Sequence, residues 1–192
     1  MTHQLNINDF LERERFSLET GIDGSFQNNY SDPATKARRL IPNYDKFAAA
    51  IYSVFKYKLT PNLNAEAGAR FDYNFYDVTK WYDTIDWYER YATTYPEFYV
   101  KTEANRVLTR PQLKYQNFSY NAGMEYHPSG KFNLKFNYAK ASRTPNIAEL
   151  FSDGLHHSAA IIEMGSMNLK NEVSHQFNLI ADVKFDFLQG LP

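Results

Sequence analysis

Aromatic and cationic side chains gather between residues 81 and 95, and they are the best candidates for ligand binding in this sequence. Aromatic faces stack on sugars, haem or catecholates, and arginine pairs with carboxylates or with the anionic groups of a ferric complex. The alternative is an aromatic loop that packs only on its neighbours. The predicted ligand-binding residues are Trp81, Trp87, Tyr88, Arg90, Tyr91 and Tyr95.

The adjacent pair His156 and His157 suggests a metal site, but its spacing argues against one. Neighbouring side chains on an extended chain point to opposite sides, and no third ligand lies at a telling spacing in the sequence. We therefore expect no bound metal, and nothing in the sequence points to a cofactor. Motifs for catalysis are missing too, because there is no nucleophile elbow, no glycine-rich phosphate loop and no His-Glu zinc motif. We expect that the protein is not an enzyme.

The composition narrows the class of protein further. Aromatic residues make up 17% of the 192 residues, yet the mean hydropathy is −0.58. A net charge of −1 argues against a nucleic-acid partner, which would require a basic surface. No stretch approaches the roughly 18 apolar residues of a transmembrane helix, and the polar segment from Thr2 to Asp9 does not resemble a secretory signal. Transmembrane β-strands are still possible, because their alternating pattern produces no hydropathy peak.

Alternation of apolar and polar residues predicts about six long β-strands. In each one the large apolar side chains fall on one face, and that face carries no Asp, Glu, Lys or Arg. On the other face we expect ladders of charged residues that include Glu66, Arg70, Asp72, Glu125, Lys131, Lys135, Asp182 and Lys184. The segment from Thr79 to Leu113 fits a short helix or a strand equally well. The predicted strands are Arg15–Phe26, Phe47–Leu59, Leu63–Phe75, Phe118–Tyr126, Phe132–Tyr138 and Val173–Phe187.

The connections between these strands alternate in length, and this favours a membrane barrel. Short turns at Thr60–Asn62 and Pro128–Gly130 alternate with long connections at Asn28–Asn43, Tyr76–Lys114 and Ala141–Glu172. All short turns therefore lie at one end of an antiparallel up-and-down meander, as in outer-membrane barrels. The predicted fold is all-β, a curved open sheet that forms part of a large transmembrane β-barrel. The alternative is a soluble secreted β-sandwich that binds glycans through the aromatic loop.

The long connection after the fifth strand carries an ordered set of residues. Its members are Arg143, Pro145, Asn146, Glu149, Leu150, Phe151, Gly154, Leu155, His156, His157, Glu163, Gly165, Asn168, Leu169, Lys170 and Glu172. This set resembles the C-terminal half of TonB-dependent outer-membrane receptors, although Asn171 stands where that family commonly has proline. We expect the motif to be structural, with Arg143, Glu149 and Lys170 building loop architecture through hydrogen bonds and ion pairs.

The resemblance implies a function in outer-membrane transport. Such receptors are barrels of about 22 strands in the cell outer membrane, filled by a plug domain that binds TonB. They take up ferric siderophores, haem, cobalamin or oligosaccharides, and which of these applies is left open by the sequence. No plug and no TonB-binding segment is found in residues 1–192, and the segment Phe187–Pro192 lacks the terminal aromatic residue of the family. We therefore interpret the chain as an internal piece of a receptor barrel.

Overall fold

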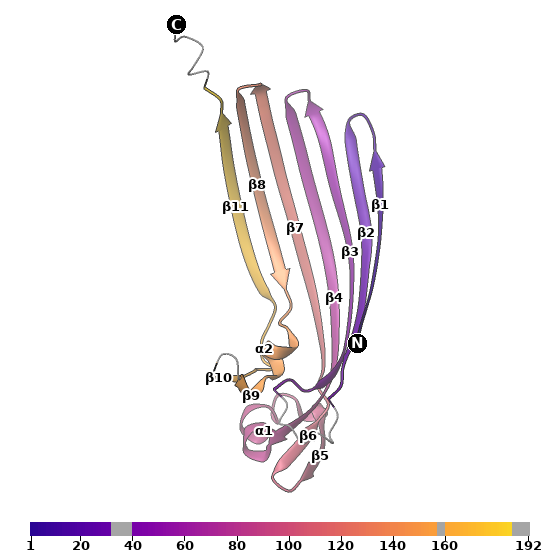
Figure 1. Cartoon of the computed structure of the whole chain (residues 1–192), viewed down its shortest axis with the longest axis vertical. Helices are drawn as coiled ribbons and strands as arrows, with labels where there is room; N and C mark the ends of the chain where they lie inside the picture. Colours follow the sequence, from indigo (N-terminus) through magenta and orange to yellow (C-terminus); the bar gives the residue numbers. More distant parts are fainter. Residues whose placement is uncertain (32–39, 157–159, 186–192) are drawn as a thin grey trace.

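The computed structural model describes residues 1–31, 40–156 and 160–185, and most of them form one antiparallel sheet. Each long strand pairs with the next long strand along the chain, in the order β1-β2-β3-β4-β7-β8-β11 (Figure 1). This confirms the predicted up-and-down meander. The strands are β1 Thr2–Glu12, β2 Phe16–Asn29, β3 Asn43–Thr60, β4 Leu63–Asp83, β7 Gln112–Ser129, β8 Phe132–Arg143 and β11 Glu172–Val183.

The short and long connections lie at opposite ends of the sheet, as predicted (Figure 1). The segment from Thr79 to Leu113, which fitted a helix or a strand equally well, contains both. The connection after β8 contains a helix and a small hairpin. The elements are α1 Thr84–Arg90, the 3-10 helix η2 Pro96–Phe98, β5 Tyr99–Glu103, β6 Arg106–Thr109, α2 Ile147–Phe151, β9 Asp153–His156 and β10 Ile161–Met164.

Two features of the strands were not predicted. β1 was missed because Thr2–Glu12 carries few large apolar residues, although Ile7 pairs with Ile22 of β2. β4 runs eight residues beyond the predicted end at Phe75 and ends at Asp83. Beyond Phe75 the buried apolar residues of β4 are Tyr76, Val78 and Tyr82, so the apolar side chains change to the opposite face. That change of face obscures the alternation.

One face of the sheet is apolar and uncovered. Its central row crosses five strands through direct cross-strand pairs, and these side chains are between 40% and 59% exposed. No second sheet packs over this face in the described part of the chain, so the β-sandwich alternative is wrong. No helix among the described residues is long and apolar enough to cross a bilayer. The row consists of Ile7, Ile22, Ile51, Phe71 and Phe118.

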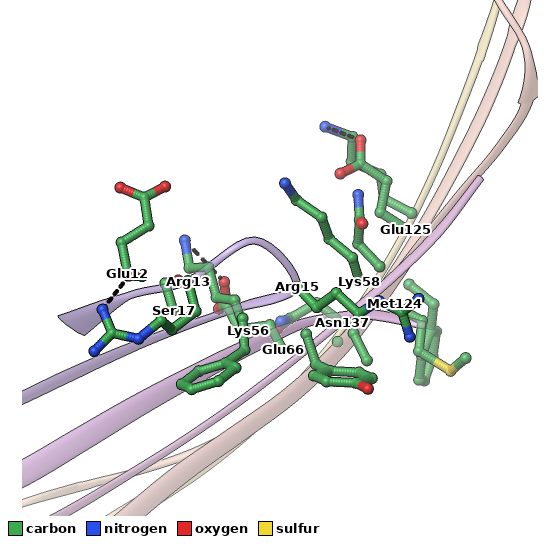
Figure 2. A pocket seen from close by; sticks show the side chains of 17 residues that line it. Glu12, Arg13, Arg15, Ser17, Lys56, Lys58, Glu66, Met124, Glu125 and Asn137 are labelled. Atoms are coloured by element: carbon green, nitrogen blue, oxygen red, sulfur yellow. Dashed lines mark hydrogen bonds and ion pairs between the residues drawn. The ribbon is translucent and has the colours of Figure 1, made fainter. Parts of the chain in front are cut away.

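The opposite face carries the predicted charged ladders. The Arg70 guanidinium lies 2.6 Å from a carboxylate oxygen of Asp23 and 2.9 Å from one of Asp72. Nearer the short turns, Lys56 pairs with Glu66 at 3.2 Å and Lys135 pairs with Glu125 at 3.0 Å. These pairs border a hollow of about 390 Å³ (Figure 2). Glu125 and its neighbour Met124 point to opposite sides of β7 there, as the two faces require.

Candidate functional site

The hydrophobic core of the described residues lies at the end of the sheet that carries the long connections. Inward side chains of β4 form its floor, and residues of α1, β6, η2 and α2 cover them. We call this assembly the loop cluster. Figure 1 shows it gathered at the end of the sheet opposite the short turns. Its core is Tyr76, Val78, Tyr82, Trp87, Tyr91, Phe98, Val107, Leu113, Ile147, Leu150, Phe151 and Met167.

Trp87 and Tyr91, two of the predicted ligand-binding residues, are part of this core. Each is only 1% exposed. The ring of Tyr82 lies 5.8 Å from that of Trp87 and 5.3 Å from that of Tyr91, centroid to centroid. A ligand cannot stack on either ring in this arrangement. These two residues correspond to the alternative interpretation, in which aromatic side chains pack on their neighbours.

Arg90 and Tyr95 join the segment between β4 and β7 to the segment between β8 and β11. The Arg90 guanidinium donates a hydrogen bond to the backbone oxygen of Gly165 at 3.2 Å and lies 5.0 Å from the ring centroid of Tyr91. The Tyr95 hydroxyl donates to the side-chain oxygen of Asn168 at 3.1 Å. Arg90 therefore holds the segment around residues 165–168 against α1, and Tyr95 holds it against the start of η2.

Trp81 and Tyr88 are the remaining candidates, and they do not lie together. Trp81 lies on β4 and points to the side opposite to Tyr82. The Lys101 ammonium lies 6.0 Å and the Arg106 guanidinium 5.7 Å from the centroid of its ring. Tyr88 is 56% exposed on α1. The structure thus separates the six predicted residues into a buried pair, a bridging pair, a partly buried Trp81 and an exposed Tyr88. Ligand contact by Trp81 and Tyr88 stays a prediction.

The motif residues after β8 build a compact helix entry. The side chain of Asn146 accepts a hydrogen bond from the Glu149 amide at 2.9 Å, and the Glu149 carboxylate accepts one from the Asn146 amide at 2.7 Å. This reciprocal capping box begins α2. The Arg143 guanidinium contacts both oxygens of Glu149 at 3.0 Å and also binds Glu172 at 2.7 Å. The hydrogen bonds from Arg143 and from the Asn146 backbone lower the pKa of Glu149.

Other motif residues fix α2 and the hairpin after it. Leu150 and Phe151 are fully buried. Gly165 packs so tightly that an added Cβ would lie 2.4 Å from the backbone nitrogen of Phe151. Gly154 has a φ of 143°, a backbone conformation that L side chains rarely adopt. The Pro145 oxygen accepts a hydrogen bond from the Tyr76 hydroxyl at 3.1 Å.

The rest of the motif is placed only in part. The backbone oxygen of Leu169 accepts a hydrogen bond from Tyr115 at 3.2 Å. His156 lies on β9, while His157 lies outside the described residues. Within the described ranges, no group of three or more His, Cys, Asp or Glu side chains is placed to hold a metal ion.

Lys80 was not predicted, although it supports the motif directly. Its side chain is almost fully buried, donates a hydrogen bond to the Phe151 backbone oxygen at 2.9 Å and lies 3.8 Å from the Asp153 carboxylate. The ammonium is also 4.5 Å from the Tyr82 ring centroid. The even positions of β4 beyond Phe75 were the available signal, because Lys80 shares their spacing with Tyr76, Val78 and Tyr82.

Comparison with known proteins identifies the family. A model of the TonB dependent receptor-like β-barrel matches residues 3–190. Among solved structures, the copper transporter OprC superposes with a TM-score of 0.65 at 13% identity, over 96% of this chain and 28% of that chain. A double mutant of the Serratia marcescens hemophore receptor HasR, in complex with HasA and heme, gives a TM-score of 0.62 at 17% identity, over 94% and 28%. The ferric-catecholate import receptor Fiu from E. coli K12 gives 0.56 at 16% identity, over 98% and 29%.

These structural likenesses show the fold alone, since sequence identity is low. The chain spans less than a third of the length of each of these three proteins. It matches none of the curated proteins compared with it. The family match covers nearly all residues and agrees with the meander, the uncovered apolar face and the loop motif. The chain therefore belongs to the TonB-dependent receptor β-barrel family.

Proposed function

We propose that this chain is a stretch of wall and outer loops of a TonB-dependent receptor in the outer membrane. In this proposal the complete barrel takes up a small ligand such as a ferric siderophore, haem, cobalamin or an oligosaccharide. A plug domain and TonB, contributed outside residues 1–192, supply the gating. The observation that carries the proposal is the division of one sheet into an uncovered apolar face and a face of paired charges.

The two faces fit two different surroundings. Hydrocarbon is the solvent that suits a continuous row of exposed Ile and Phe side chains, because it needs no hydrogen bonds from them. The paired charges on the other face suit a wet barrel interior or the surface of a plug. Since short turns face the periplasm in such barrels, the loop cluster would lie at the exterior mouth, where a ligand arrives.

Trp81 and Tyr88 are the side chains that we assign to ligand contact within this chain. Trp81 offers an aromatic ring beside two cations, Arg106 and Lys101, the second of which also pairs with Glu103. Such a ring suits an anionic aromatic ligand such as a ferric catecholate. Tyr88 offers an exposed ring and hydroxyl on α1. The buried Trp87 and Tyr91 would support this surface without touching the ligand.

Uptake by the complete receptor tests this proposal. Cells that express the whole reading frame containing this chain, with and without TonB, would be given each ligand class in labelled form. We expect TonB-dependent accumulation of one class and a loss of affinity in the double variant Trp81→Ala and Tyr88→Ala. The matched control is Tyr99→Ala, another exposed tyrosine of the same connection. Uptake that does not depend on TonB, or a protein that remains monomeric and soluble without detergent, would contradict the proposal.

A further inference from the structure

We infer that the apolar face carries a binding site for the phosphate group of an outer-leaflet lipid, formed by Lys140, His175 and Tyr138. This inference rests on the proposed function, because it requires that the face meets the outer membrane. It concerns lipid recognition by the barrel wall and is independent of the transported ligand.

The three side chains come together through the strand register. Lys140 of β8 and His175 of β11 are direct cross-strand partners. On its other side Lys140 pairs with Tyr120 of β7, whose ring centroid lies 5.8 Å from the Lys140 ammonium. The Tyr138 hydroxyl lies 2.9 Å from His175 Nδ1, and the ring of Tyr138 lies 6.0 Å from that of Tyr120. A cation, an imidazole and a phenol thus share one small patch across three strands.

This patch offers hydrogen-bond donors and lacks an acid. When the Tyr138 hydroxyl donates to Nδ1, the His175 proton sits on Nε2 and can be donated to a ligand. The Lys140 ammonium has three hydrogen-bond donors, and it lies over the ring of Tyr120. Within the described chain no carboxylate forms an ion pair with Lys140. A phosphate group would supply the acceptor oxygens and the negative charge.

The surroundings explain why an acid is missing nearby. On the same face, the three cross-strand rows next to this patch contain only apolar and aromatic side chains, and the row at the short turn adds the uncharged Ser129. A charged side chain on the lipid face is unfavourable at the centre of the bilayer and is tolerated near its edges. Lys140 and His175 should therefore lie at an edge. The rows are Ala122–Tyr138–Phe177, Met124–Phe136–Leu179, Tyr126–Leu134–Ala181 and Ser129–Phe132–Val183.

The depth of the patch agrees with the outer edge of the hydrocarbon layer. Lys140 follows the turn between β7 and β8 by about nine residues, the length with which a tilted strand crosses a bilayer. At about 3.3 Å per residue and a tilt of about 40°, these residues span about 23 Å, close to the apolar band of about 25 Å in such barrels. Since the short turns face the periplasm, the patch lies at the level of the outer-leaflet headgroups.

A lipid is a better occupant than a soluble anion for the same reason. Phe177, directly below the patch, is 70% exposed, and Phe136 is also exposed. Acyl chains can pack on these rings while the phosphate reaches Lys140 and His175. A soluble anion would leave the apolar neighbours uncovered.

Lipid retention by the complete receptor tests this inference. The purified protein would be stripped of lipid in detergent, incubated with bisphosphorylated lipid A or with its dephosphorylated form, and examined by native mass spectrometry. From the typical effect of a basic residue near a charged lipid surface, we expect the double variant Lys140→Gln and His175→Gln to bind bisphosphorylated lipid A about 30-fold more weakly. Removing the phosphates should weaken binding to the native protein to a similar degree.

The matched control is Lys114→Gln. Lys114 is an exposed lysine of β7 on the same face, opposite Phe75 and away from the patch. We expect its lipid binding to stay within about twofold of the native value. An equal loss in this control would indicate general charge attraction and would overturn the site. Equal binding of both lipid forms, unchanged binding by the double variant, or displacement of the lipid by low millimolar inorganic phosphate would overturn it as well.

Two further readouts separate this inference from the proposed function. The heat-dependent gel mobility of each variant reports whether the barrel is folded, and uptake is measured on the same variants. Normal TonB-dependent uptake without phosphate-dependent lipid retention would overturn the lipid site and leave the transport function intact. A native protein that needs no detergent would overturn the transport function itself.

Discussion

Gly165 provides the sharpest test of the loop cluster, because replacing it with alanine forces backbone atoms apart. The added Cβ would lie 2.4 Å from the Phe151 nitrogen, 2.5 Å from the Leu150 carbonyl carbon and 2.7 Å from the Leu150 oxygen. All three are main-chain atoms at the end of α2, so no flexible side chain can move aside. Overpacking of this kind typically costs about 1–3 kcal/mol.

Hydrogen exchange of two amides in the complete receptor would measure this cost. The Gly165 amide donates to the Ser152 oxygen at 2.8 Å, and the Ser166 amide donates to the Glu149 oxygen at 3.0 Å. A loss of about 1–3 kcal/mol corresponds to roughly 5- to 150-fold faster exchange of these amides if they exchange through local opening. Amides in the long strands should exchange as before, because the barrel wall is not involved.

The control for this substitution is Gly130→Ala in the turn between β7 and β8. A Cβ at Gly130 would meet no atom within 4 Å. We expect exchange near residue 165 to be unchanged in this variant. If Gly165→Ala also leaves the Gly165 and Ser166 amides protected to within about twofold, the close packing of the motif against α2 is refuted.

Three other substitutions or conditions test the remaining parts of the structure. Trp87→Ala should destabilise the loop cluster by about 3–5 kcal/mol, measured by thermal unfolding in detergent, while Trp81→Ala should destabilise it much less because the Trp81 ring lies outside the core. Equal effects of the two substitutions would contradict the assignment of Trp87 to the core. The capping box should remain formed from pH 7 down to pH 4.5, the usual pKa of a glutamate, because the pKa of Glu149 is lowered in the folded protein and its stabilising effect disappears only as the pH falls through that lowered pKa. Loss of protection of the Glu149 amide near pH 6 would exclude this. Ile51→Lys on the apolar face should reduce assembled barrel by the equivalent of about 2–4 kcal/mol, whereas Ala50→Lys, which faces Asp72 in the register, should assemble normally; equal assembly of both would contradict the assignment of faces.

Much of the barrel wall could be predicted, because different surroundings on its two faces require a strict alternation of apolar and polar residues. The strand from Leu63 to Phe75 alternates cleanly, since one side meets hydrocarbon and the other meets water or charge. β1 was not predicted, because its polar residues outnumber apolar residues such as Leu5 and Ile7. Its pairing with β2 defines it as a strand instead. The continuation of β4 was not predicted, because the loop cluster covers its inward side. Tyr76 and Val78 therefore place the apolar residues on the opposite face from Leu63–Phe75, and the alternation is interrupted there.

The candidate site was less predictable, because it depends on contacts between distant segments. Trp87 and Tyr88 are neighbours of similar chemistry, and only the direction of α1 decides that the first is buried and the second exposed. The role of Glu149 was partly foreseeable, because an Asn followed three residues later by Glu is a capping-box pattern. Its ion pair with Arg143, and the burial of Lys80 against Phe151, require the packed loops.

The solvent that covers the apolar face can be measured directly by labelling single positions, and residues 1–192 contain no cysteine that would compete for the label. Single cysteines at Ile51 or Phe71 and at Ala50 or Asp72, placed in the complete protein in lipid vesicles and labelled with a fluorophore, would be exposed to nitroxide-bearing lipids. We predict strong quenching at Ile51 and Phe71 and little quenching at Ala50 and Asp72, so that the signal alternates along each strand. Equal quenching at all four positions, or none at Ile51 and Phe71, would contradict the assignment of this sheet to the wall of a membrane barrel.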